Sequence, residues 1–293
     1  MSINSSKSRD LFWRRVIGDG LISIPSSERW VTERINYQAL AKHFSVNFNT
    51  VDMLSIDSYE QLPSYFKRLD CGIIRLGYGI QKNTADFILC KPTKGAQDLY
   101  LFNDRLFYSD SSYGNGIDDN EYDIIARLLQ RIDRLDERAG LNLFSYLFQF
   151  KDIFNMRDSR ILSFSYKTTH TFKFIIESGL EPVEFINGQI EVDLLLLLTS
   201  KEGQYKVVVI EAKSGSNNRS IAKHKILYST MVAKRLFPDT DDILPAYLHI
   251  TDEEGEVSFN FCTLKMDYRD GMPVLTSLTA KDTYSIKISR NNK

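Results

Sequence analysis

The fold of this chain is decided between Gly188 and Lys213, where the sequence reads GQIEVDLLLLLTSKEGQYKVVVIEAK. Two apolar runs flank the polar turn Ser200–Gln204. Both runs have the length of β-strands and are rich in Val, Ile and Leu, so the pattern predicts a β-hairpin. The alternative is a surface hairpin whose Glu and Lys form an ordinary cross-strand pair. Because both faces of the runs are apolar, we expect two central strands instead.

Side chains alternate between the two faces of a strand, and this alternation sorts the polar residues of the hairpin. The predicted shared faces are Glu191, Asp193, Leu195 and Leu197 in the first strand, and Val207, Val209, Glu211 and Lys213 in the second. The opposite faces are wholly apolar: Val192, Leu194, Leu196 and Leu198, then Val208, Ile210 and Ala212. The acids are therefore expected at one end of the hairpin.

Buried carboxylates at that end need a compensating charge, because an unpaired one costs several kcal/mol or takes up a proton. Asp193, Glu211 and the Ala212 carbonyl offer three oxygens to a hard divalent cation. Mg²⁺ suits such a site, and Mn²⁺ is expected to substitute for it. Lys213 is expected beside the metal-bound water.

The spacing Glu191-x-Asp193 followed by Glu211-x-Lys213, with 211 − 193 = 18 residues between the inner acids, resembles the PD-(D/E)xK nuclease superfamily. Type II restriction endonucleases and archaeal Holliday-junction resolvases belong to this superfamily. The resemblance covers roughly Phe164 to Ile250. It implies an α/β (α+β) fold, namely a restriction-endonuclease-like mixed sheet flanked by helices.

The resemblance also implies roles for the residues. Asp193 and Glu211 would hold one or two Mg²⁺ ions, and Lys213 would orient the attacking water and shield the phosphate. Glu191 would be a further ligand or a support for Lys213. Many members supply another acid from a preceding helix, and the nearby candidate here is Glu177.

Basic residues are concentrated after the first strand of the hairpin, although the net charge of the chain is only −1. Between residues 206 and 235 the one acid is Glu211, and the basic residues are Lys206, Lys213, Arg219, Lys223, Lys225, Lys234 and Arg235. We expect Arg219, Lys223 and Lys225, at the start of a predicted helix Arg219–Phe237, to contact the DNA backbone. A solvated helix face is the alternative.

The stretch Ile35–Leu54 resembles a helix-turn-helix. In that reading Asn47, Asn49, Thr50 and Asp52 project from the start of a recognition helix, whose first residues contact base edges. Two ordinary helices of a helical domain are the alternative.

Predicted strands Ile73–Leu76, Asp86–Cys90 and Leu99–Phe107 follow and suggest a winged-helix arrangement. Residues 1–115 are therefore interpreted as a winged-helix-like DNA-recognition domain. Residues 116–160 are interpreted as a connector of two helices, Glu121–Arg138 and Leu141–Phe154. Residues 161–293 are interpreted as the nuclease domain.

Two further elements are predicted at the start of that domain. Leu162–Ser178 is predicted as a helix. A turn is predicted at Asn187-Gly188.

The composition indicates a folded protein of 293 residues with 43% hydrophobic residues. Its three cysteines, Cys71, Cys90 and Cys262, are widely spaced, which predicts buried free thiols in a reducing cytoplasm. The first ten residues lack the apolar region of a secretory signal, and the longest apolar run, Leu194–Leu198, is too short to span a membrane.

Taken with the resemblance, these features predict a Mg²⁺-dependent type II restriction endonuclease that hydrolyses phosphodiester bonds of double-stranded DNA at a specific short sequence. A homodimer is expected, because a palindromic site presents two equivalent strands. Two alternatives stay open: a structure-selective repair or recombination nuclease of the same fold, and a non-catalytic helix-turn-helix DNA-binding regulator.

Overall fold

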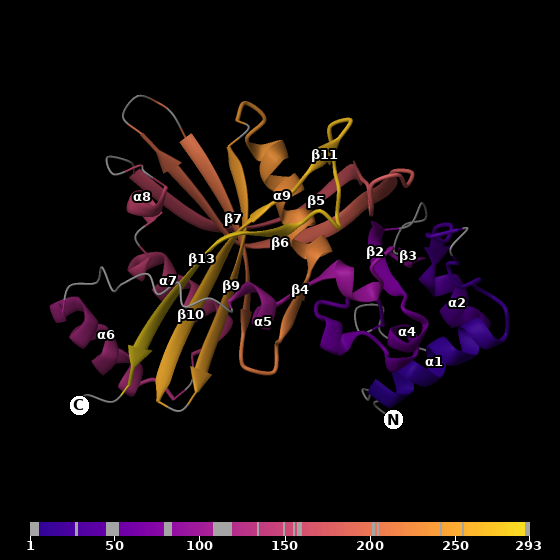
Figure 1. The fold of residues 1–293 in the computed structure, drawn as a ribbon, viewed down its shortest axis with the longest axis horizontal. Coiled ribbons are helices and arrows are strands. Elements are labelled where there is room, and N and C mark those ends of the chain that lie inside the picture. Colours follow the sequence, from indigo (N-terminus) through magenta and orange to yellow (C-terminus); the bar gives the residue numbers. More distant parts are fainter. Residues whose placement is uncertain are drawn as a thin grey trace.

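The computed structural model describes residues 6–26, 29–44, 53–78, 84–107, 119–133, 135–148, 150–154, 156, 160–200, 203, 205–240, 242–253 and 255–290. Within these residues the chain is a mixed α/β structure built on a large twisted sheet (Figure 1). None of the helices described is long and apolar enough to cross a membrane.

The described residues form a nine-stranded sheet with the order β1-β3-β2-β6-β7-β9-β10-β13, and β5 pairs with β6. Its larger strands are β5 (Arg160–Phe174), β6 (Val183–Thr199), β7 (Tyr205–Ser214), β9 (Ile243–Glu253), β10 (Glu256–Lys265) and β13 (Thr279–Ser289). Strands β5, β6 and β7 form an antiparallel meander, helix α9 (Lys223–Leu236) crosses over, and β9 runs parallel to β7. The predicted central hairpin is therefore confirmed as β6 and β7.

Both faces of the hairpin are covered, because alternate residues of β7 enter different cores. Val207 and Val209 pack in the core that contains α9, whereas Val208, Ile210 and Ala212 pack in the other core. That second core contains side chains of α6 (Asp119–Gln130), α7 (Glu137–Leu147) and α8 (Phe150–Ile153). The sheet thus lies between α9 on one face and α6 to α8 on the other (Figure 1).

The N-terminal elements are coloured indigo to purple in Figure 1, and their strands β1, β3 and β2 form one end of the large sheet. They are α1 (Ser6–Gly18), β1 (Ile35–Asn36), α2 (Tyr37–His43), η1 (Tyr59–Gln61), α4 (Ser64–Leu69), β2 (Gly72–Tyr78), β3 (Ala85–Cys90), η2 (Ala96–Leu99), β4 (Tyr100–Phe102) and α5 (Asn103–Leu106). Their buried side chains share one continuous core with α9 and β6. Strand β4 also pairs with β8 (Ser220–Ala222), directly before α9.

Glycine at residue 77 permits a close approach of β2 to β6. Gly77 of β2 pairs with Ile186 of β6, and a Cβ atom at Gly77 would collide with the Ile186 carbonyl oxygen. Its φ of 83° also lies in the region that favours glycine.

The predicted helix Leu162–Ser178 is wrong, because this segment is the 15-residue strand β5. Its even-numbered residues from Phe164 to Phe174 are partly or fully buried and its odd-numbered residues are exposed, which is the period of a strand. The predicted turn at Asn187-Gly188 is wrong as well. Asn187 has a φ of 45° but lies inside β6.

Other boundaries differ from the prediction. The predicted helix Glu121–Arg138 is interrupted, since α6 ends at Gln130 and Asp136 caps the start of α7. The predicted strand Leu99–Phe107 ends at Phe102 and continues as α5.

The N-terminal module is described only in part. Strands β2 and β3 pair antiparallel, and α2 lies in the stretch where the first helix of a helix-turn-helix is predicted. Asn47, Asn49, Thr50 and Asp52 lie outside the described residues.

Two minor strands complete the fold. Strands β11 (Tyr268–Arg269) and β12 (Met272–Pro273) form a separate pair.

Candidate functional site

The candidate site lies where β6 and β7 part. Their backbone pairing ends at Leu194 and Ile210, whereas β7 continues to pair with β9 as far as Ser214. Just beyond the last pair, the Ala212 N–H donates to Oδ2 of Asp193 at 2.9 Å. A side-chain oxygen of β6 therefore takes the place that a backbone carbonyl would occupy in a continuing ladder.

A β-bulge in β6 places Asp193 at this point. Phe164 of β5 pairs with Leu195, and Tyr166, two residues on, pairs with Val192, so β6 carries one extra residue. The Ser165 hydroxyl donates to the Asp193 carbonyl at 2.8 Å and holds the bulge. Bulges re-aim side chains and are frequent beside functional sites.

Because of the bulge, some side chains of β6 lie on the opposite face of the strand from the one that the sequence predicts. Val192 lies in the same core as Leu195, while Leu194 lies in the opposite core. A regular strand would have placed Val192 and Leu194 on one face. The prediction that Glu191 and Leu195 share a face is therefore wrong, because the extra residue reverses the alternation between them.

Glu211 is the most enclosed acid of the site, with 1% of its surface exposed. The Ser229 hydroxyl, from the middle of α9, donates to its carboxylate. Burial raises the pKa of Glu211 well above its usual value, and the nearby charge of Asp193 raises it further. The charges of Lys225 and Lys213 act in the opposite direction. Such a carboxyl gains from an additional cation.

Lys213 ends the Glu-x-Lys sequence and lies beside an acid that the sequence did not single out. Its Nζ is 3.9 Å from Oε2 of Glu137, the first residue of α7. Burial raises the pKa of Glu137, the charge of Lys213 lowers it and that of Asp193 raises it again. Glu137 is not among the predicted site residues, because Glu121–Arg138 is predicted as one helix and no helix is expected to start at Glu137.

Lys225 belongs to a group of charged side chains, called the cluster below, that also contains Asp57, Glu137, Asp193, Glu211 and Lys213. Its Nζ is 3.1 Å from Oδ2 of Asp57, which comes from the N-terminal part of the chain. Burial alone would lower the pKa of Lys225, but the carboxylates of Glu211 and Asp57 outweigh it and raise that pKa. The side chain is 30% exposed and already paired, so its placement does not support the predicted contact with the DNA backbone.

Two other predicted residues lie away from the cluster. Glu191 pairs with Lys167 across β5 and β6 at 3.4 Å, with 65% of its side chain exposed. Glu177 accepts the Thr93 N–H at 2.9 Å, on the N-terminal side of the molecule. Glu137, and not Glu177, is the acid that lies beside Lys213.

The predicted DNA-contacting residues divide into two kinds. Arg219 is exposed. Lys223 is buried, pairs with Asp98 at 3.3 Å and donates to the Thr276 carbonyl at 2.9 Å. The prediction that Lys223 contacts DNA is therefore wrong, because its ammonium group is buried and bonded to Asp98 and to the Thr276 carbonyl.

The oxygens at the parting of the strands fit a hard divalent cation. The N–H and the carbonyl of a strand residue point to the same edge, so the Ala212 carbonyl lies on the edge that faces Asp193. With Asp193 and Glu211 it forms an all-oxygen set of the kind that Mg²⁺ prefers. No group of three or more His, Cys, Asp or Glu side chains arranged to hold a metal occurs within the described ranges.

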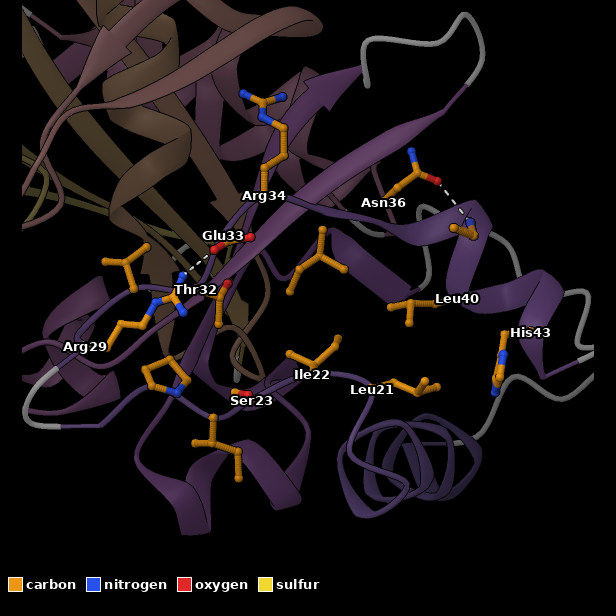
Figure 2. A pocket seen from close by; sticks show the side chains of 15 residues that line it. Leu21, Ile22, Ser23, Arg29, Thr32, Glu33, Arg34, Asn36, Leu40 and His43 are labelled. Atoms are coloured by element: carbon orange, nitrogen blue, oxygen red, sulfur yellow. Dashed lines mark hydrogen bonds and ion pairs between the residues drawn. The ribbon is translucent and has the colours of Figure 1, made fainter.

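A separate pocket of about 490 Å³ lies in the N-terminal part (Figure 2). Its wall includes the apolar side chains of Ile22 and Leu40, and an ion pair of 2.8 Å between Arg29 and Glu33 lies at its margin. None of the cluster residues lines it, so it is distinct from the candidate site.

The three cysteines are buried free thiols, as predicted. Burial raises the pKa of Cys71 to about 11, which leaves the thiol protonated at neutral pH. They take no part in the cluster.

Comparisons of the chain with models of protein families, with curated proteins and with solved structures found no match. The function is therefore inferred from the geometry and chemistry of the cluster.

Proposed function

We propose that this protein is a Mg²⁺-dependent type II restriction endonuclease, which hydrolyses phosphodiester bonds of double-stranded DNA at a specific short sequence. The observation that carries the proposal is the bond from the Ala212 N–H to Asp193, beside the buried Glu211 and with Lys213 on the same strand. An acid on one central strand, Glu-x-Lys on the next and a helix after them is the arrangement of the superfamily that the sequence resembles.

Asp193, Glu211 and the Ala212 carbonyl are the groups that would hold Mg²⁺. When bound, this ion supplies a more acidic water and offsets negative charge on the phosphate. Ser229 positions Glu211 from α9, and the Ala212 N–H positions Asp193, so both carboxylates are oriented before substrate arrives. Lys213 is assigned to orient the attacking water and to stabilise negative charge on the phosphate.

The charge balance of the cluster favours a metal-dependent reaction. Four acidic side chains, Asp57, Glu137, Asp193 and Glu211, interact with two ammonium groups, those of Lys213 and Lys225, so the cluster carries an excess of negative charge when its acids are ionised. An excess of negative charge repels DNA phosphate and attracts divalent cations. We therefore expect the phosphate to approach productively only when a cation is bound.

A digest of supercoiled plasmid with Mg²⁺, with and without EDTA, tests the proposal. Discrete fragments that disappear in EDTA are the expected result. Cleavage that requires branched or nicked DNA would favour a structure-selective repair or recombination nuclease instead. DNA binding without any cleavage would favour a non-catalytic regulator and would overturn the proposal.

Sequence reading and assembly belong to the same proposal. We assign base readout to Asn47, Asn49 and Thr50, whose substitution should change the preference among sequences by about 1–3 kcal/mol per lost base contact. Unchanged selectivity would assign the readout to other parts of the chain. A homodimer is expected on a palindromic site, and light scattering of the protein with and without DNA measures the assembly.

A further inference from the structure

A segment of the N-terminal part is bonded to the start of α9. The Ala222 N–H, at the residue before the first turn of α9, donates to the Asp57 carbonyl at 2.8 Å. The Tyr59 N–H donates to the Ser220 hydroxyl at 2.8 Å, and this hydroxyl donates to Glu60 at 2.7 Å. The backbone around Asp57 is therefore fixed relative to α9.

From this fixed backbone position, the side chain of Asp57 forms an ion pair with Lys225. The two charged groups are 3.1 Å apart, and 29% of the Asp57 side chain and 30% of the Lys225 side chain are exposed. Glu211, the other carboxylate that acts strongly on Lys225, has its hydrogen bond from Ser229 instead. The charges of both acids act on Lys225, and its direct ion pair is with Asp57.

Whether Lys225 pairs with Asp57 or with Glu211 affects how well the cluster can bind a divalent cation. An ammonium group that paired directly with Glu211 would neutralise the carboxylate and occupy the space of a divalent ion. Pairing with Asp57 leaves the Glu211 carboxylate available and adds one negative charge near it. Both effects strengthen the attraction of the cluster for a cation.

We propose that Asp57 is a positioning residue of the metal site, which holds Lys225 on its own carboxylate so that Glu211 stays available to a divalent cation. This inference rests on the proposed function, because it presumes that Asp193 and Glu211 bind a metal. It makes the N-terminal part a component of the catalytic centre as well as the expected reader of sequence.

The test measures binding of Mn²⁺, and separately Ca²⁺, to the full-length protein by titration calorimetry. Asp57→Asn should weaken binding about tenfold, the effect that one charge at close range has on a neighbouring carboxyl. Asp98→Asn is the matched control. It removes a carboxylate from Lys223, two residues before Lys225 in the same helix, and should leave metal binding unchanged.

A second substitution distinguishes positioning from direct ligation. In the double variant Asp57→Asn with Lys225→Met, the competing ammonium group is gone, so metal affinity should return to the wild-type level or exceed it. Lys225→Met alone should bind metal at least as tightly as the wild type. That single variant also tests the proposal if Asp57→Asn does not fold, which thermal unfolding will show.

Three results overturn the inference: wild-type affinity in folded Asp57→Asn, a double variant that stays weak, or weakened binding in Lys225→Met. The last two would mean that Asp57 or Lys225 supports the metal in another way. If the wild-type protein binds neither ion, the proposed metal site itself fails. This outcome is distinguishable from a failure of the Asp57 inference alone, in which the wild type binds and the variants do not differ.

Discussion

The Ala212 N–H donates to the carboxylate of Asp193 over 2.9 Å, and this bond joins the two halves of the candidate site. The last backbone pair of β6 and β7 is Leu194 with Ile210, so Asp193 lies one residue beyond it and Ala212 two residues beyond it. A carboxylate that accepts a backbone N–H is held in one orientation. The same bond also sets where Glu211 and Lys213, on either side of Ala212, lie relative to Asp193.

Replacing Asp193 by Asn should abolish cleavage without unfolding the protein. The amide oxygen of Asn can still accept the Ala212 N–H, but the negative charge that attracts Mg²⁺ is lost. We expect a loss of at least about 10³-fold in rate, which corresponds to roughly 4 kcal/mol of barrier. Plasmid cleavage measures the rate. Glu191→Gln is the control and should retain activity, because Glu191 forms an exposed ion pair with Lys167. An inactive Glu191→Gln variant would show that Glu191 takes part in catalysis after all.

Glu211 should make the metal-free protein less stable as the pH rises. Burial raises its pKa above the ordinary value of 4.5, so the folded chain holds this proton more tightly than the unfolded chain. The free energy of unfolding therefore falls as the pH rises above about 4.5 and levels off above the folded-state pKa. Glu211→Gln removes this contribution.

Thermal unfolding in EDTA across this pH range should accordingly show a smaller loss of Tm for Glu211→Gln than for the wild type. Ser229→Ala provides a second comparison. The Ser229 hydroxyl lowers the pKa of Glu211, so its removal should make the loss of Tm larger. Parallel curves for the wild type and Glu211→Gln would contradict the assignment.

Lys213→Met should slow cleavage while metal binding persists. The ammonium group is assigned to the transition state, where loss of one stabilising donor costs about 10²–10³ in rate. Lys206→Met is the control, because Lys206 lies on the same strand but pairs with Asp242 at 3.1 Å, away from the cluster. Cleavage rates at saturating Mg²⁺ compare the two variants, and equal rates would exclude a chemical role for Lys213.

Glu137→Gln should reduce activity more than Glu177→Gln. Glu137 lies 3.9 Å from Lys213 and interacts electrostatically with Asp193 and Lys225. Glu177 instead accepts the backbone N–H of Thr93, away from the cluster. Loss of a group that supports a metal site typically costs about 10–100-fold. The dependence of cleavage rate on Mg²⁺ concentration measures the effect. If only the Glu177 variant is impaired, the assignment of the additional acid is wrong.

Arg219 and Lys223 should respond differently to substitution. Arg219→Ala should weaken binding to all DNA sequences and reduce the salt dependence by about one charge, because this side chain is exposed. Lys223→Ala should instead lower the Tm, because it leaves Asp98 without its buried partner. Fluorescence anisotropy in Ca²⁺ at several salt concentrations measures binding. A salt slope that changes for Lys223→Ala and not for Arg219→Ala would reverse the two roles.

Local patterns of the sequence were sufficient for the central hairpin. The β6–β7 pair forms from two apolar runs joined by a short turn, so strand length, turn chemistry and order in the chain all agree. The alternation in β7 correctly placed Val207, Val209 and Glu211 on one face, because no bulge interrupts that strand. The same alternation runs from Phe164 to Phe174 in β5, where a helix is predicted, so the period of a strand is present in that segment too.

The sequence by itself therefore determined the hairpin and the proximity of Asp193, Glu211 and Lys213, since neighbouring strands bring nearby residues together. Only the tertiary structure decided which other groups join them. The bulge at Asp193 depends on pairing with β5, and it separates Glu191 from the cluster. Asp57 and Glu137 arrive from distant segments through the packing of the N-terminal part and α7. Residue spacing carries no information about such contacts, because burial and charge pairing across the whole chain determine them.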